Sequence, residues 1–116
     1  PMKKPIVYGI PNCDSVKKAR VWLTEHGQDY DFHDFKKQGV PEERLQQWLQ
    51  CCGWEVVLNR KGTTWRKLDA AAQSAVIDPQ SATQLMLVQA SVIKRPVIEW
   101  PSGAITVGDT PEQWPA

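Results

Sequence analysis

The start of the chain alternates between strand and helix, and this order constrains the fold more than any other feature. Residues 6–8 are an apolar run typical of a buried strand, and Gly9 follows as a break. Apolar residues then recur at helical spacing over about residues 14–26, and Gly27 supplies a stop signal. Residues 30–33 alternate apolar and polar side chains, which predicts a half-buried strand. The sequence therefore predicts an opening β-α-β unit.

The remainder of the chain is predicted to be helical in its middle and to end in a hairpin. Leu45, Trp48, Leu49 and Cys52 recur at i, i+3, i+4 and i+7, which is typical of one buried helix face. The predicted pieces are, in order, a loop at 36–40, a helix at about 41–52, a short apolar segment at 56–58, a turn at 59–62, a helix at about 63–72 capped by Thr63 or Thr64, a helix at about 79–89 capped by Asp78, a hairpin of 97–100 and 104–107, and a capping box at 110–113.

These pieces fit one domain. The 116 residues can bury a real core but are too few for two ordinary domains. We expect a single domain over residues 2–116, in which about residues 41–92 form a helical insertion. The order of elements predicts an α/β fold with a thioredoxin-like (glutaredoxin-like) mixed β-sheet, whose β-α-β unit and closing hairpin flank the inserted helical subdomain. The active site of that fold usually lies at the first strand-to-helix turn, where Cys13 falls.

The composition argues against several classes of function. Fourteen basic and thirteen acidic residues leave the chain almost neutral, unlike a protein built to bind nucleic acid or an anionic membrane. No apolar run approaches the length of a membrane helix, and the start shows no signal-peptide pattern. Three cysteines do not make a disulfide framework, and two histidines without a Cys-x-x-Cys pair make no zinc site. We therefore expect a cytoplasmic protein without a bound metal.

Cys13 is the main candidate for chemistry. It lies where the predicted strand passes into the predicted helix, so unpaired backbone N–H groups and the positive end of the helix dipole face its sulfur. The positive charges of Lys17 and Lys18, about one turn later, favour the thiolate, whereas the neighbouring carboxylate of Asp14 disfavours it. A thiol in such a position ionises more readily than a free cysteine, and the thiolate is the nucleophile. We therefore expect Cys13 to be a reactive thiol.

Cys51 and Cys52 are interpreted differently. Cys52 completes the apolar stripe of its helix, so we expect it in the core. Cys51 lies off that stripe and is expected at the surface, and nothing in the sequence places it near Cys13. A disulfide between the two neighbours would be strained. Neither is predicted to resolve an adduct on Cys13.

Four motifs, in order along the chain, carry a resemblance to a known family. They are YGIPNCDSVKKA at residues 8–19, YDFHDFKK at 30–37, LNRKGTTW at 58–65 and KRPVI at 94–98. Together they resemble the arsenate reductase (ArsC)/Spx superfamily, and within it most closely the YffB branch of glutathione-dependent thiol reductases. The resemblance covers essentially the whole chain.

The resemblance implies a thioredoxin-like fold of the ArsC/Spx type and a nucleophilic cysteine, which falls on Cys13. It places two arginines of the thiol or anion pocket on Arg60 and Arg95, and a cis-proline junction on the Arg95–Pro96 bond. Lys17 is a candidate to stabilise the thiolate or to meet a substrate carboxylate. The candidate residues for binding the substrate or glutathione are Asn12, Lys17, Arg60, Arg95 and Pro96.

Two departures from the family pattern bear on function. Arsenate reductases of this family carry a further arginine just after the glycine of the closing hairpin, but residues 103–107 here contain no basic residue. Many Spx regulators carry Cys-x-x-Cys, but the second cysteine position here is Val16. We therefore expect a thiol-dependent reductase with one nucleophilic cysteine and with glutathione, or another small thiol, as the resolving cosubstrate. An arsenate reductase and a non-enzymatic Spx-like protein that docks on a protein partner remain alternatives.

Overall fold

A four-stranded mixed sheet organises the part of the chain around Cys13. The computed structural model describes residues 4–115. Its sheet has the order β2-β1-β3-β4. β1 pairs in parallel with β2 and antiparallel with β3, and β3 pairs antiparallel with β4. The strands are β1 (Ile6–Gly9), β2 (Asp31–Asp34), β3 (Val97–Glu99) and β4 (Ile105–Val107). The predicted β-α-β unit and closing hairpin are thereby confirmed.

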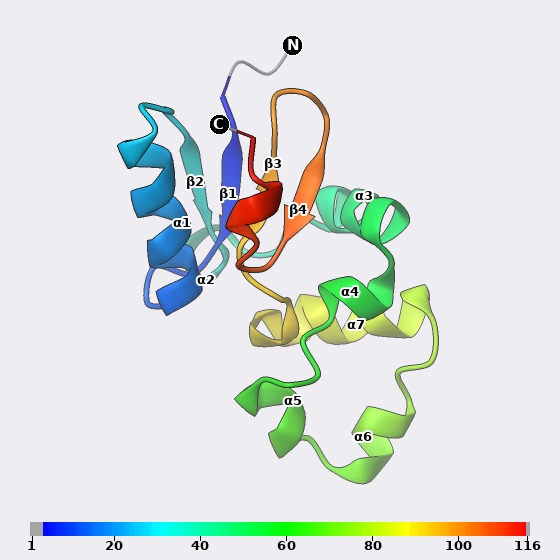
Figure 1. Ribbon diagram of the computed structural model, residues 1–116. Coiled ribbons are helices and arrows are strands. Elements are labelled where there is room, and N and C mark those ends of the chain that lie inside the picture. The colour runs from blue at the N-terminus through cyan, green and yellow to red at the C-terminus, as the bar shows by residue number, and fades with distance from the viewer. Residues whose placement is uncertain (1–3, 116) are drawn as a thin grey trace. The chain divides into compact units, whose positions relative to one another are not determined.

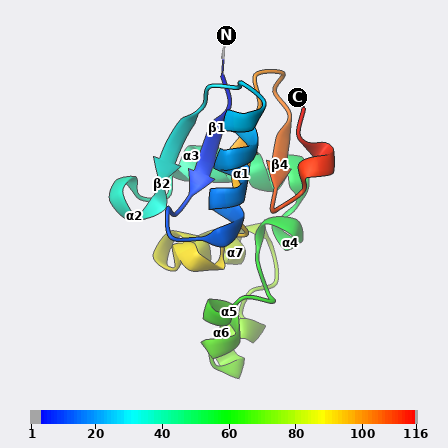
Figure 2. The same cartoon turned by 60° about the vertical axis from the view of Figure 1, so that its left-hand side comes forward.

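The parallel pair β1–β2 requires a crossover, which α1 (Asp14–Glu25) supplies. Val16, Ala19 and Leu23 repeat along one face of α1 and are fully buried. That face packs into a core cluster of buried residues from the start, middle and end of the chain, and Figure 2 shows α1 running alongside β1. The cluster comprises Val7, Ala19, Leu23, Ile98, Trp100 and Trp114.

The chain forms two compact units (Figure 1). The first contains the sheet, α1 and a short helix α2 (Phe35–Gln38), and consists of the described residues up to Gly39 and from Arg95 onward. The second unit is Val40–Lys94 and is helical. The predicted insertion, about residues 41–92, falls within it.

The second unit has its own short elements. An antiparallel bridge joins Leu58 to Ile93 near its end. The backbone N–H of Asn59 donates to Val92 O and that of Lys94 donates to Val57 O, each at 2.7 Å. The helices are α3 (Glu42–Cys52), α4 (Trp54–Val57), α5 (Thr63–Lys67), α6 (Ala70–Ser74), α7 (Pro79–Val88) and the 3-10 turn η1 (Ala90–Val92).

Some local predictions are wrong. The expected loop at 36–40 begins with α2, because the Asp34 carboxylate caps it by accepting from Lys36 N at 2.9 Å. The pattern at 56–58 predicts only a short apolar segment, and residues 56 and 57 of it lie in α4. The single helix expected at 63–72 is two, because the backbone is extended at Leu68 and Asp69 caps the second helix.

Two cap predictions also fail. The N-cap of α5 is Gly62 and not a threonine. At the C-terminal 3-10 turn η2 (Pro111–Gln113), Thr110 is the N-cap but its side chain makes no capping hydrogen bond. By contrast, Asp78 caps α7 as predicted and forms a full capping box with Ser81.

Within the described residues, no helix is both long and apolar enough to cross a membrane.

Candidate active site at the end of the sheet

The sheet topology gathers the first unit's candidate residues at one edge. β1 and β2 are parallel, so both end at the same edge, with Gly9 beside Asp34. β3 runs antiparallel to β1 and Tyr8 lies beside Val97, so Arg95 and Pro96 enter the sheet at this edge. The loop from Ile10 to Cys13 leaves β1 there. The edge therefore holds the loop with Asn12 and Cys13, the first turn of α1, and the Arg95–Pro96 junction.

Gly9 fixes how closely α1 approaches the end of β1. A Cβ atom built on Gly9 would lie 2.7 Å from Cγ2 of Val16, which is fully buried in the first turn of α1. Carbon atoms in contact sit at about 3.5–4.0 Å, so no other side chain fits at residue 9 unless Val16 is displaced. The lack of a side chain at Gly9 thus allows the start of α1, and with it Cys13, to pack closely against β1.

Cys13 is the N-cap residue of α1. Its backbone is extended, with φ −144° and ψ 125°, and its side chain makes no capping hydrogen bond. Its carbonyl accepts the first helical bond, from Lys17 N at 2.9 Å. The residue is half-buried. The thiol is therefore not used as a cap, and it lies at the end of a helix whose first-turn N–H groups have no partner within the helix.

The three cations of α1 have different surroundings. Lys18 Nζ lies 3.1 Å from Asp109 Oδ2. Arg20 donates from Nε to the hydroxyl of Tyr30 at 3.0 Å and places its guanidinium 4.2 Å from the centre of the Phe32 ring. Within the described part of the chain, Lys17 makes no such pair. It is spaced i, i+4 from Cys13, on the same side of the helix start.

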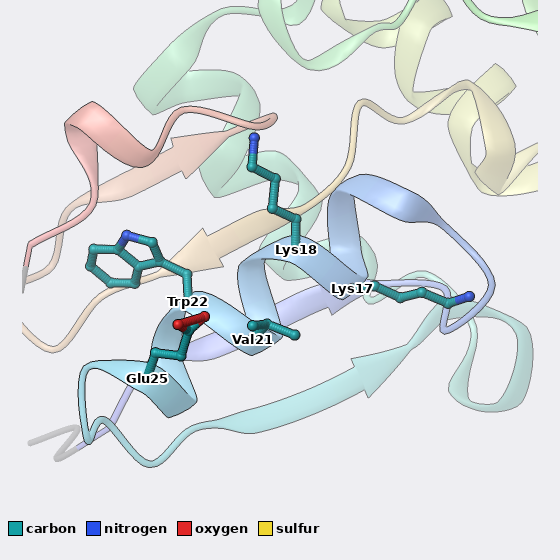
Figure 3. Close-up of a pocket in the computed structure, with 5 residues that line it drawn as sticks. All are labelled: Lys17, Lys18, Val21, Trp22 and Glu25. Atoms are coloured by element: carbon teal, nitrogen blue, oxygen red, sulfur yellow. The ribbon is translucent and has the colours of Figure 1, made fainter.

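A hollow of about 350 Å³ lies on the outward face of α1 and is lined by Lys17, Lys18, Val21, Trp22 and Glu25. Figure 3 shows Lys17 and Lys18 leaving the helix in different directions, with Val21 between them and Glu25. Its lining does not include Cys13, so we do not assign it to the site.

The Arg95–Pro96 peptide bond is cis, as the family resemblance predicts. Pro96 is buried, and its carbonyl accepts from Gly108 N at 2.8 Å, next to the pairing of Val97 with Val107. Arg95 is half-buried at the sheet edge. Asn12 is exposed in the loop before Cys13.

Sequence reasoning missed Asp34 and α2. Asp34 is 7% exposed, and besides capping α2 it donates from its backbone N–H to Gln38 Oε1 at 3.1 Å. Nε2 of His33 lies 2.8 Å from the carbonyl oxygen of Gly39. These contacts hold the segment that follows β2 at the same edge as Cys13. The signal was present: an Asp that can cap a helix, and a glycine five residues later, Gly39, with φ 76°.

Arg60 belongs to the second unit. Its guanidinium is 5.7 Å from the centre of the Trp54 ring and 3.7 Å from Glu55 Oε2. It lines a hollow of about 250 Å³ together with Lys61, Lys94 and others. Its role beside Cys13 stays a prediction.

The other two cysteines differ in exposure. None of the three cysteines is in a disulfide; Cys51 is exposed and Cys52 is half-buried, so Cys52 is less deeply placed than its helical stripe predicts. Burial, reinforced by a hydrogen bond and charge interaction with Cys51, raises the pKa of the Cys52 thiol to about 11. Cys52 is therefore protonated at neutral pH. No group of three or more potential metal ligands occurs among the described residues.

Comparison with known proteins gives one family. The model of the ArsC family matches residues 8–116. A solved structure of a YFFB protein is 50% identical, with a TM-score of 0.87 over 94% of both chains. An ArsC-related protein from Brucella melitensis is 48% identical, with a TM-score of 0.75 over 97% of this chain and 93% of that one. These likenesses confirm the thioredoxin-like fold of the ArsC type.

Two further relatives extend the comparison. An uncharacterized protein of Haemophilus influenzae is 39% identical over 79% of this chain and 80% of its own length. The global transcriptional regulator Spx of Streptococcus pyogenes is 27% identical over 76% of this chain and 66% of its own length.

Proposed function

Because the chain belongs to the ArsC family, we propose that it is a thiol reductase in which Cys13 is the nucleophile and glutathione is the resolving thiol. The observation that carries the proposal is the position of Cys13 at the start of α1, half-buried and without a capping role. Helix N-termini favour negative charge, and a thiolate is the nucleophilic form of cysteine.

The reaction has three thiol–disulfide exchanges. The Cys13 thiolate attacks one sulfur of a disulfide substrate, forms a mixed disulfide and releases the other sulfur as a thiolate that takes up a proton. The thiolate of one glutathione then attacks the Cys13 sulfur, releases the second substrate thiol and leaves glutathione disulfide-bonded to Cys13. The thiolate of a second glutathione attacks the glutathione sulfur of this adduct, which regenerates the Cys13 thiolate and gives oxidised glutathione, so the two glutathione molecules supply the two electrons.

An external thiol is proposed because the motif around Cys13 carries no second cysteine. Val16 occupies the position of a second motif cysteine. Cys52 keeps its proton at neutral pH, since burial raises its pKa to about 11. Glutathione is an abundant thiol of the reducing cytoplasm, and three unpaired cysteines fit that compartment.

The binding roles follow from charge and placement. Lys17 and Arg95 supply positive charge at the edge that holds Cys13, suited to glutathione carboxylates. Asn12 and the backbone at Pro96 offer polar groups for an extended peptide, and Arg60 is proposed to add a cation from the second unit.

Two other functions compete with this proposal, namely arsenate reduction and docking on a protein partner. Residues 103–107 hold no arginine for a tetrahedral oxyanion, which disfavours arsenate as the substrate. Similarity to Spx keeps a docking function open. Such a function predicts a complex with a protein partner that survives Cys13→Ser and needs no turnover.

The test is intact-mass analysis after exposure to oxidised glutathione across a pH series. We expect one glutathione adduct on the wild type, on Cys51→Ser and on Cys52→Ser, and none on Cys13→Ser. Lys17→Gln is expected to slow adduct formation about two- to fivefold, the size of one exposed charge interaction. Lys18→Gln is the matched control, because Lys18 is already paired with Asp109.

Adducts confined to Cys51 or Cys52 would contradict the proposal. So would turnover of a glutathione mixed disulfide by Cys13→Ser at the wild-type rate. A folded protein that forms no adduct until alkaline pH would favour the docking function.

A further inference from the structure

The outward face of α1 exposes an apolar side chain that borders two hollows. Val21 is 55% exposed and lies on the side of the helix opposite to the buried Val16, Ala19 and Leu23. Val21 and Glu25 line both the hollow of about 350 Å³ described above and a second one of about 230 Å³. Single exposed valines are common, but one that borders two hollows offers a projecting side chain beside recesses where another surface can pack.

Two charges of opposite sign lie on either side of Val21 along this face. Lys17 precedes it by four residues and Glu25 follows it by four, so the three side chains lie along one side of the helix. Figure 3 shows Lys17 and Glu25 on opposite sides of Val21. Among residues 4–115, neither charge forms an ion pair. The two cannot pair with each other, because eight residues of helix separate them by about 12 Å.

The order Lys17, Val21, Glu25 is complementary to itself when reversed. If a second α1 lies antiparallel to the first with the two Val21 side chains in contact, each Lys17 faces the Glu25 of the other copy. Packed helix axes lie about 8–10 Å apart, a separation that lysine and glutamate side chains can span together. A parallel arrangement would instead place like charges opposite each other. The antiparallel, twofold-symmetric pair therefore gains two ion pairs around a central apolar contact.

We propose that the outward face of α1 is a self-association surface, on which a second copy of this chain docks with its own α1 antiparallel. A second copy is favoured over an unrelated partner because the face complements itself in charge, and the formal net charge of +1 adds little repulsion between copies. α1 has 12 residues and is about 18 Å long, so the interface is small. We therefore expect a weak dimer, with a Kd between about 10 μM and 1 mM. This association is independent of the proposed reductase function.

The experiment is sedimentation equilibrium of the full chain across the concentration range of that Kd. A reducing agent is present throughout, because the exposed Cys51 could otherwise link two chains covalently. We expect the weight-average mass of the wild type to rise from that of one chain toward that of two. Val21→Ala should raise the Kd about tenfold or more, because it removes apolar contact from both chains. Alanine favours the helix more than valine does, so the variant keeps α1 intact.

Charge reversal tests the pairing itself. Lys17→Glu and Glu25→Lys each place like charges opposite one another at two points, so each variant alone should dimerise about tenfold or more less tightly. An equimolar mixture of the two variants restores both ion pairs, and it should form mixed dimers with about the wild-type Kd. Lys67→Glu is the matched control, because Lys67 is exposed on α5 and its reversal changes the net charge by the same amount as Lys17→Glu.

The opposite results would overturn the proposal. These are a wild type that stays monomeric over the whole range, unchanged assembly of Val21→Ala, a mixture of the two reversed variants that remains monomeric, or equal losses from Lys67→Glu and Lys17→Glu. A monomeric wild type would leave this face to a partner of another kind. Because mass in solution and not adduct formation is measured, the absence of a glutathione adduct on Cys13 would defeat the reductase proposal alone.

Discussion

At the scale of single residues, the close approach of α1 to β1 depends on the lack of a Cβ atom at Gly9. Gly9 lies at the end of β1, and the side chain of Val16 occupies the space that a Cβ atom would need. The backbone of Gly9 requires no special angle, so its role here is steric. Cys13 lies between these two residues in the chain, and their contact therefore sets where its thiol sits.

We predict that Gly9→Ala destabilises the protein by about 1–3 kcal/mol, the usual range for an overpacked core. It should also slow alkylation of Cys13, because the helix start must move. Urea unfolding and the rate of reaction with iodoacetamide measure the two effects.

The control is Val16→Ala combined with Gly9→Ala. The smaller side chain at residue 16 makes room for the new methyl group, so the double variant should be more stable than the sum of the single changes by about 0.5–3 kcal/mol. Strict additivity would show that the Gly9–Val16 contact does not position α1.

At the scale of elements, α7 shows how a short sequence signal becomes a pH-dependent helix start. Ser81 N donates to Asp78 Oδ1 at 2.8 Å, and Asp78 N donates to Ser81 Oγ at 3.1 Å. The backbone bond from Ser81, and then that from its hydroxyl, lowers the pKa of the Asp78 carboxyl. Ionised Asp78 therefore stabilises the folded protein. This contribution is complete above the carboxyl's unfolded pKa, about 3.9, and is lost as the pH falls through the lower folded value.

We predict that Asp78→Asn removes this titration while keeping an oxygen that can cap the helix. The wild type should be the more stable protein at pH 6, and the difference in melting temperature should shrink toward pH 3. Thermal unfolding of both proteins at the two pH values tests this. A gap that stays constant or widens on acidification would contradict the role of the charged cap.

At the scale of the whole molecule, two tryptophans join the first unit's core from distant parts of the chain. Trp100 and Trp114 are 2% and 5% exposed and share a cluster with Val7 and Leu23. Trp100 donates from Nε1 to Thr106 Oγ1 at 3.0 Å. The indole N–H of Trp114 is buried and has no hydrogen-bond partner among residues 4–115, and its ring meets that of Trp22 edge-on.

This contrast predicts unequal effects of the same substitution. Trp100→Phe and Trp114→Phe remove similar volume, but only the first leaves a buried hydroxyl without its donor. We expect Trp100→Phe to be the more destabilising by about 1–2 kcal/mol in urea unfolding. Equal losses, or a larger loss at Trp114, would mean that ring packing and not the hydrogen bond sets the difference.

How much of this architecture could be predicted depends on the range of the interactions. The opening β-α-β unit, the hairpin and the Asp78 cap could be predicted from neighbouring residues. The cis bond at Pro96 was predicted from the family resemblance. The break between α5 and α6 at Leu68, and the helix that follows Asp34, could not be predicted because neighbouring residues there favour more than one local structure. The Gly9–Val16 approach and the pairing of Lys18 with Asp109 depend on tertiary placement, which residue patterns do not carry.

The division of the first unit into two chain segments has a consequence for synthesis. Val40–Lys94 intervenes between β2 and β3, and β3 is the second neighbour of β1 in the sheet. Translation proceeds at about 5–20 residues per second, so a nascent chain holds β1, α1 and β2 for several seconds before β3 emerges. During that interval one edge of β1 has no pairing strand, and Cys13 meets the surrounding solution without Arg95 and Pro96 beside it. The ribosome thus exposes Cys13, the proposed nucleophile, before it supplies Arg95 and Pro96, which are proposed to complete its site.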